Sequence, residues 1–168
     1  KIGGFSGSGA LLVNKDFNGL IPKVSGGGQE FGLRGGTENL LGIISFGECA
    51  SALKDIDNEG IRLKELIRLL EDNLSSLGAN IFGYNVRRLP NTSLFSFTEF
   101  KAESLLMKLD LAGFSVSSGS ACSSGKVKES HVLKAMNISE SMQKGAIRVS
   151  LGWGSNKEQV ENLIICVR

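Results

Sequence analysis

The sequence predicts an α/β fold, in which short strands alternate with helices around one core. A stripe of five leucines from Leu63 to Leu77, spaced three or four residues apart, indicates an amphipathic helix. After Gly78, short runs with strand patterns alternate with helical runs. Hydrophobic residues make up 41% of the 168 residues, which is enough for a buried core.

Glycine-rich loops dominate the chain before the leucine stripe. A strand is expected over 10–13, followed by a second loop, "SGGGQEFGLRGG", over 25–36. A helix is expected from Thr37, separated from the leucine-stripe helix by a break near Gly60. Because the strand over 10–13 has no sheet to join, we expect this part of the chain to be poorly packed by itself.

The remaining elements are expected after Gly78, which suits a helix C-cap. They are strands over 79–82 and 92–97, a helix over 101–112, a strand over 114–117, a short helix near Ser130, a strand over 146–151 and a C-terminal helix. Ser155 and Glu158 have the spacing of a capping box at the start of that last helix. The chain therefore divides into residues 1–36, linking helices over 37–78 and a small α/β domain over 79–168.

Composition excludes several classes of function. The net charge is +2 with acids and bases spread along the chain, which argues against a nucleic-acid surface. No run is apolar and long enough to span a bilayer, and no signal peptide is visible. The three cysteines, Cys49, Cys122 and Cys166, are widely spaced and odd in number, which fits free thiols in a reducing, cytoplasmic setting.

Cys122 lies in an unusual segment, "VSSGSACSSGKVKES", over 116–130. A structural cysteine prefers apolar neighbours, and this one has serines and glycines instead. It is either a surface thiol in a linker or a nucleophile on a mobile arm, and we expect residues 118–128 to be mobile. The segment is not a phosphate-binding loop, because the glycine spacing is wrong and Val127 replaces the required hydroxyl.

Other candidate sites are weaker. One histidine and no CxxC motif give little support for a metal site. A Cys122–His131 nucleophile pair is an open alternative, although a place near a helix N-terminus explains His131 equally well. Arg148, in the strand-like "AIRVSLG", either faces solvent or binds a carboxylate, and the pattern favours solvent.

Four segments together resemble the pyridoxal-phosphate-dependent cysteine desulfurases (NifS/IscS-like) of the class V aminotransferase superfamily. They are "KIGGFSGSGALL", "GGGQEFGLRGGTEN", "SSGSACSSG" and "IRVSLGW", in the order of the family. The resemblance is to members that carry their cysteine in a long mobile loop. It implies the C-terminal part of a fold-type I transferase, with residues 1–36 a remnant of the large cofactor-binding domain. Phe5 and Ser6 depart from the family, which usually has Pro and Lys there.

The resemblance also implies roles for individual residues. Lys1 matches the lysine that binds pyridoxal phosphate covalently and moves a proton, and Cys122 matches the nucleophile that takes sulfur from L-cysteine as a persulfide, leaving L-alanine. Arg148 matches the arginine that pairs with the substrate carboxylate, for which a planar guanidinium is suited. Thr37 matches the threonine that reaches the cofactor phosphate of the neighbouring subunit in a homodimer. Arg34 matches a loop arginine to which no role is assigned.

The implied activity is sulfur transfer to an iron–sulfur scaffold or another acceptor protein, without nucleic acid or membrane partners. The family's N-terminal half, with most of the cofactor site, is not in this sequence, so the chain alone is expected to be inactive. The alternatives are a non-catalytic fragment or docking module, and another class V enzyme such as an aminotransferase. The cysteine-bearing segment argues against an aminotransferase, because transamination needs no nucleophilic thiol.

We predict that Cys122 reacts faster with an alkylating reagent than the other two thiols. Lys126 and Lys128 favour its thiolate, whereas Cys49 and Cys166 lie in helical, apolar surroundings where a thiol is inert when buried. Mass-mapped alkylation of the native chain measures the order. Faster modification of Cys49 or Cys166 would remove the main chemical support for the resemblance.

Overall fold

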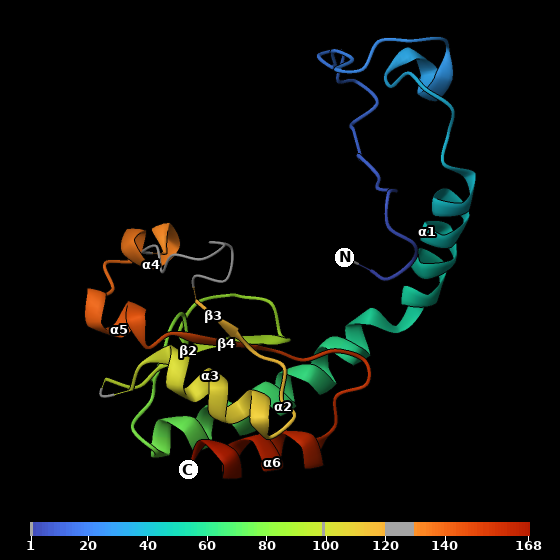
Figure 1. The fold of residues 1–168 in the computed structure, drawn as a ribbon. Helices are drawn as coiled ribbons and strands as arrows, with labels where there is room; N and C mark the ends of the chain where they lie inside the picture. Colours follow the sequence, from blue (N-terminus) through green and yellow to red (C-terminus); the bar gives the residue numbers. More distant parts are fainter. Residues whose placement is uncertain (1, 99, 120–129) are drawn as a thin grey trace. The chain divides into compact units, whose positions relative to one another are not determined.

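The computed structural model describes residues 2–98, 100–119 and 130–168 (Figure 1). The chain forms two compact units, Lys1–Ile56 and Asp57–Arg168. Of the divisions expected from the sequence, the one after residue 36 falls inside the first unit and the one after residue 78 inside the second. Across the described ranges, none of the helices has the length and apolar character needed to cross a bilayer.

The first unit contains two 3-10 helices, η1 (Gln29–Gly32) and η2 (Leu53–Asp55), and the helix α1 (Leu40–Ala52). The strand expected over 10–13 is wrong, because these residues have no regular secondary structure. A strand needs a hydrogen-bonded neighbour, and all four strands of the described chain lie in the second unit. Leu12 is accordingly 97% exposed.

Two helix boundaries differ from the sequence expectation. Helix α1 begins at Leu40 rather than Thr37, because Asn39 is the N-cap and its side chain accepts a hydrogen bond from the Gly42 N–H at 3.2 Å. The break between the helices lies at Leu53–Asp55 rather than at Gly60, which lies inside α2 (Ile56–Ser76). A glycine inside a long, well-packed helix costs only about 1 kcal/mol, so it need not end the helix.

The second unit is a four-stranded antiparallel sheet with helices, which confirms the α/β fold class. Its strands are β1 (Asn80–Ile81), β2 (Thr92–Ser96), β3 (Ser117–Ser118) and β4 (Ile147–Ser150), in the order β1-β2-β4-β3. Helices α2, α3 (Ala102–Leu111) and α6 (Lys157–Val167) lie together along one side of the sheet (Figure 1). Two short helices, α4 (His131–Ala135) and α5 (Glu140–Lys144), complete the unit.

The core of the second unit lies between the sheet and these three long helices. The leucine stripe is confirmed: its first four members are buried on α2, and Leu77 lies just beyond the end of the helix and is exposed. Leu66, Leu70 and Leu74 pack with apolar side chains of β2, β4, α3 and α6, which are Phe95, Ile147, Val149 and Leu109 among others. Since alternate residues of a strand face opposite sides, β4 buries Ile147 and Val149 and exposes Arg148 and Ser150.

Local hydrogen bonds end the helices where the chain must turn. Gly78 and Gly113 have positive φ, and each supplies the left-handed residue of a Schellman motif after α2 and α3. At the start of α6 the expected capping box is displaced by one residue, because Asn156 and Gln159 form it instead of Ser155 and Glu158.

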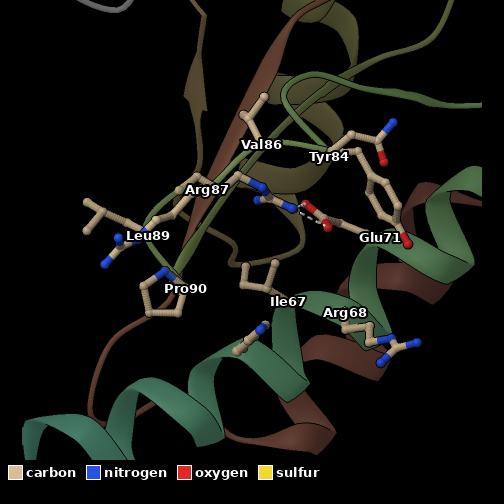
Figure 2. A pocket seen from close by; sticks show the side chains of 11 residues that line it. Ile67, Arg68, Glu71, Tyr84, Val86, Arg87, Leu89 and Pro90 are labelled. Carbon is tan, nitrogen blue, oxygen red and sulfur yellow. Dashed lines mark hydrogen bonds and ion pairs between the residues drawn. The ribbon is translucent and has the colours of Figure 1, made fainter.

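A buried polar network fixes the loop that joins β1 to β2. Glu71 of α2 is 2% exposed, and its two carboxylate oxygens accept hydrogen bonds from Arg88 Nη2 at 2.7 and 2.6 Å (Figure 2). Ser93 Oγ donates to Glu71 Oε1 at 2.6 Å, and Arg88 Nη1 donates to the Thr92 carbonyl at 2.8 Å. Each polar side chain of this network thus has a partner, as burial requires.

We predict that Glu71→Ala lowers the free energy of unfolding of the second unit by about 3 kcal/mol, because it leaves Arg88 without its carboxylate. Urea titrations followed by Trp153 fluorescence and far-UV circular dichroism measure the loss. Asp72→Ala is the matched control, since its ion pair with Arg68 is 3.9 Å long and exposed and is worth less than about 1 kcal/mol. Equal effects of the two substitutions would contradict this account of the network.

Candidate active-site surface

Arg148 lies on the side of the sheet opposite α2, α3 and α6. In the β4 register it is paired with Leu94 of β2 on one side and with Ser117 of β3 on the other. The neighbouring pair on the same face is Thr92 and Ser150, whose hydroxyl oxygens are 3.2 Å apart. This face therefore presents a guanidinium among small polar and apolar side chains.

Among the described residues, Arg148 forms no ion pair or side-chain hydrogen bond, and it is exposed. The strand pattern alone favoured this solvent-facing position, whereas the family resemblance implies that Arg148 binds a carboxylate. A guanidinium presents five donors in a fixed fork that matches a carboxylate. The unused fork of Arg148 is consequently available to an acidic ligand.

A second apolar cluster lies beside Arg148, at the start of β4. Its buried members are Phe82, Leu133 and Ala146. Ala146 precedes Arg148 by two residues, so strand alternation places both on the same face. Leu94, the β2 partner of Arg148, packs against the cluster.

This cluster anchors both ends of the segment that carries the predicted nucleophile. At one end, the Gly119 N–H donates to the Ala146 carbonyl at 2.8 Å. A Cβ at Gly119 would lie only 2.9 Å from the Ala146 Cβ, so the close approach requires glycine. At the other end, Ser130 caps α4 by accepting a hydrogen bond from the N–H of the buried Leu133 at 3.4 Å.

Cys122 itself lies outside the described residues, as does the rest of the segment over 120–129. The expected mobility of residues 118–128 is therefore tested only at Ser118 and Gly119, which are held by pairing with Ile147 and by the hydrogen bond to Ala146. The described residues directly before this segment lie at β4, because β3 pairs with β4. His131 is the exposed first residue of α4, which fits the simple helix-terminus interpretation. The structure does not test its pairing with Cys122.

In the first unit, the residues that follow Lys1 run along α1. A Cβ at Gly4 would lie 3.0 Å from Ser45 Oγ, and the positive φ of 77° also favours glycine there. The Phe5 N–H donates to Ser45 Oγ at 2.9 Å, and Ser8 Oγ donates to the Gly42 carbonyl at 2.9 Å. Lys1 lies outside the described residues.

Thr37 lies close in sequence to this contact. Asn39, the N-cap of α1, donates from Nδ2 to the Gly7 carbonyl at 3.4 Å. Thr37 is exposed two residues before Asn39. The loop that carries Thr37 and the segment over 7–8 therefore meet at the N-terminal end of α1. Arg34, in the same loop, donates from Nη1 to the Gly35 carbonyl at 2.7 Å.

Sequence reasoning missed a residue that holds the end of β4. Arg62 of α2 donates to the Ser155 carbonyl at 2.6 Å and the Trp153 carbonyl at 3.3 Å, in the turn after β4. Glu59 orients Arg62 through two hydrogen bonds of 2.7 and 2.6 Å. The hydrogen bond from Arg62 lowers the pKa of the Glu59 carboxyl. The i,i+3 spacing signals the pair, but only the fold reveals its contact with the turn.

The free thiols of the described chain are Cys49 and Cys166, both half-buried. Cys166 packs against the main core, and Cys49 lies beside Gly3 and Gly4. Within the described ranges, no three His, Cys, Asp or Glu side chains come together as a metal site would need. The candidate surface therefore consists of Arg148 and the two anchors of the 120–129 segment.

Comparison with known proteins decides the family. The model of the class V aminotransferases matches residues 1–163. The chain belongs to the class V aminotransferase family. Pyridoxal phosphate is the cofactor that this family implies.

The relatives of this class V chain include several cysteine desulfurases. One named IscS, from Dictyoglomus turgidum, is 42% identical over 165 residues, and the match covers 95% of this chain but 41% of the relative. Another, IscS 1 from Archaeoglobus fulgidus, is 37% identical over 163 residues and is covered to 42%. The chain thus spans about two-fifths of the length of these relatives.

Solved structures of NifS-like proteins also match this class V chain. The X-ray structure of a NifS-like protein from Rickettsia africae ESF-5 has a TM-score of 0.73 and 36% identity. That match covers 88% of this chain and 39% of the other. A second NifS-like protein has a TM-score of 0.74 and 32% identity. The fold assignment to the C-terminal part of such a transferase is therefore confirmed.

We predict that Arg148→Ala changes the free energy of unfolding by no more than about 0.5 kcal/mol, since an exposed, unpaired side chain contributes little stability. Ile147→Ala, one residue earlier in β4, removes a fully buried side chain and costs about 3 kcal/mol. Urea titrations of the two variants make the comparison. A large loss of stability in Arg148→Ala would show that the arginine serves the fold rather than a ligand.

Proposed function

We propose that this chain is the C-terminal part of a cysteine desulfurase, which converts L-cysteine to L-alanine and leaves a persulfide on Cys122. The observation that carries the proposal is the pairing of Ser117 with Arg148, which brings the start of the Cys122 segment alongside an unpaired guanidinium. The 42% identity to a cysteine desulfurase over 95% of the chain supports it. The activity is proposed for a protein of the relatives' full length and not for this chain alone.

Arg148 is proposed to bind the carboxylate of the substrate cysteine. Its guanidinium is exposed and has no ion-pair partner among the described residues, so no existing pair must be broken. Buried Ile147 and Val149 fix the strand on both sides of it. A bidentate pair with the substrate would set the direction in which the thiol side chain of cysteine points.

Cys122 is proposed to attack the sulfur of the bound substrate as a thiolate. Cys122 is the third residue after the Gly119 anchor, and three extended residues span at most about 11 Å. This short connection to Gly119 is consistent with a Cys122 thiol that reacts with a substrate bound by Arg148. The new S–S bond forms as the substrate's carbon–sulfur bond breaks, and the persulfide stays on the protein for an acceptor.

The residues of the first unit fit a phosphate-bearing cofactor at the N-terminal end of α1. The Thr37 hydroxyl is exposed there, and helix N-termini favour anions. We propose that Thr37 holds the phosphate of pyridoxal phosphate, from the neighbouring subunit of a homodimer, and that Lys1 binds a cofactor covalently. Pyridoxal phosphate, when bound, supplies the electron withdrawal that labilises the substrate's Cα proton. Lysine suits the transfer of that proton once its pKa is lowered.

The proposal includes an acceptor protein, such as an iron–sulfur scaffold, and a cytoplasmic setting in keeping with the free thiols Cys49 and Cys166. The three parts of the chain would be a remnant of the large domain over 1–36, linking helices over 37–78 and a small domain over 79–168.

We predict that Cys122→Ala, in the full-length protein loaded with pyridoxal phosphate, abolishes persulfide and alanine formation but not cysteine binding. Cofactor absorbance during a cysteine titration reports binding, and alanine analysis reports turnover. Arg148→Lys should raise the KM for cysteine, because an ammonium cannot bind a carboxylate as a fork. Cys166→Ala is the matched control and should retain activity. Alanine formation at the normal rate by Cys122→Ala would refute the proposed role.

A further inference from the structure

A hollow of about 570 Å³ lies between α2 and the loop over 83–91 that joins β1 to β2 (Figure 2). Ile67, Arg68 and Glu71 line it from α2, while Tyr84, Val86 and Leu89 line it from the loop (Figure 2). None of its lining residues takes part in the proposed reaction. All belong to the second unit, so the hollow is formed within one compact part of the chain.

The charges around the hollow are mostly positive. Four cations line it, Lys64, Arg68, Arg87 and Arg88, against the single carboxylate of Glu71. Arg88 donates two short hydrogen bonds to that carboxylate, so these two charges are paired with each other. Arg68 approaches Asp72 only to 3.9 Å. Lys64 and Arg87 have no ion-pair partner among the described residues, so the hollow carries surplus positive charge.

Exposed apolar side chains stand among these cations. Tyr84 is 51% exposed, Val86 64% and Leu89 73%. The buried Ile67 lies deeper between them. Tyrosine and arginine are the residues enriched at the energetic centres of protein interfaces, and here they occur together around one depression.

The hollow suits a segment of another protein better than a small molecule. A small-molecule site buries most of its ligand's surface, whereas these lining side chains are largely exposed. The polar groups deepest in the hollow, on Glu71 and Arg88, already satisfy each other, so no buried group is left to bind a small anion. An interface needs instead a firm, partly apolar surface with charge at its rim, which this loop provides.

The loop is held in place before any partner arrives. Arg88 ties it to α2 through Glu71 and to β2 through the Thr92 carbonyl at 2.8 Å. The Phe82 N–H donates to the Leu94 carbonyl at 2.8 Å where the loop begins. A surface ordered in this way loses little conformational entropy on binding.

We propose that this hollow docks an acidic peptide segment of a partner protein. Aspartate or glutamate side chains of the segment would face Lys64 and Arg87, and an apolar side chain would pack against Tyr84 and Leu89. Charge complementarity of this kind raises the association rate and selects acidic partners. The proposal does not depend on the chemistry of Cys122, so it stands or fails separately from the proposed reaction.

The test starts from random-sequence peptides displayed on phage and selected against the immobilised chain. We expect the selected peptides to carry several acidic residues beside one large apolar residue. Fluorescein-labelled copies are then titrated with the chain and followed by anisotropy. Lys64→Glu with Arg87→Glu should weaken binding at least about tenfold, and rising salt should weaken binding to the wild type.

Lys101→Glu with Lys108→Glu is the matched control, because it makes the same change in net charge on exposed residues outside the hollow. It should leave affinity within about twofold at the salt concentrations where surface charges are screened. Lys64→Gln with Arg87→Gln provides a second variant with an intermediate loss, and unfolding curves check that all variants fold. Selection of peptides without acidic enrichment, or equal losses in the two charge-reversal variants, would overturn the proposal. Complete displacement by inorganic phosphate would assign the hollow to small anions and overturn it as well.

Discussion

The antiparallel pairing of β4 with its two neighbours is the constraint on which the second unit depends. Strand β4 lies between β2 and β3, and its alternate residues divide two environments. Ile147 and Val149 enter the core formed with α2, α3 and α6, while Arg148 stays on the other face. The same pairing brings Ser117, and with it the start of the cysteine-bearing segment, next to Arg148. One strand thus sets both the core and the candidate active-site surface.

Much of the second unit follows from local sequence signals. The spacing of the leucines defines α2, and glycines at 78 and 113 end α2 and α3, because only a residue that tolerates positive φ completes the Schellman motif. The exposure of Arg148 follows from strand alternation. The short polar helix α5 gave no periodic signal. The start of α1 was expected three residues early, at Thr37, because the hydrogen bond by which Asn39 caps the helix is visible only in the structure.

The sequence could not reveal what depends on contacts between distant residues. The strand expected over 10–13 has a suitable pattern but lacks a partner strand among the described residues. The close approach of Gly119 to Ala146, the contact of Arg62 with the turn after β4 and the Glu71–Arg88 pair all join segments far apart in the chain. The roles of Lys1, Cys122, Thr37 and Arg148 came from the family resemblance, which composition and spacing alone did not supply.

The central claim is that sulfur from a substrate held near Arg148 is passed to Cys122. The most direct measurement is peptide mass mapping of the full-length, cofactor-loaded protein after incubation with isotopically labelled cysteine and blocking of free thiols. The account predicts one extra labelled sulfur atom on the peptide that contains Cys122 and none on the peptides of Cys49 and Cys166. Labelled sulfur on either of those peptides, or alanine production with no labelled sulfur on Cys122, would contradict it.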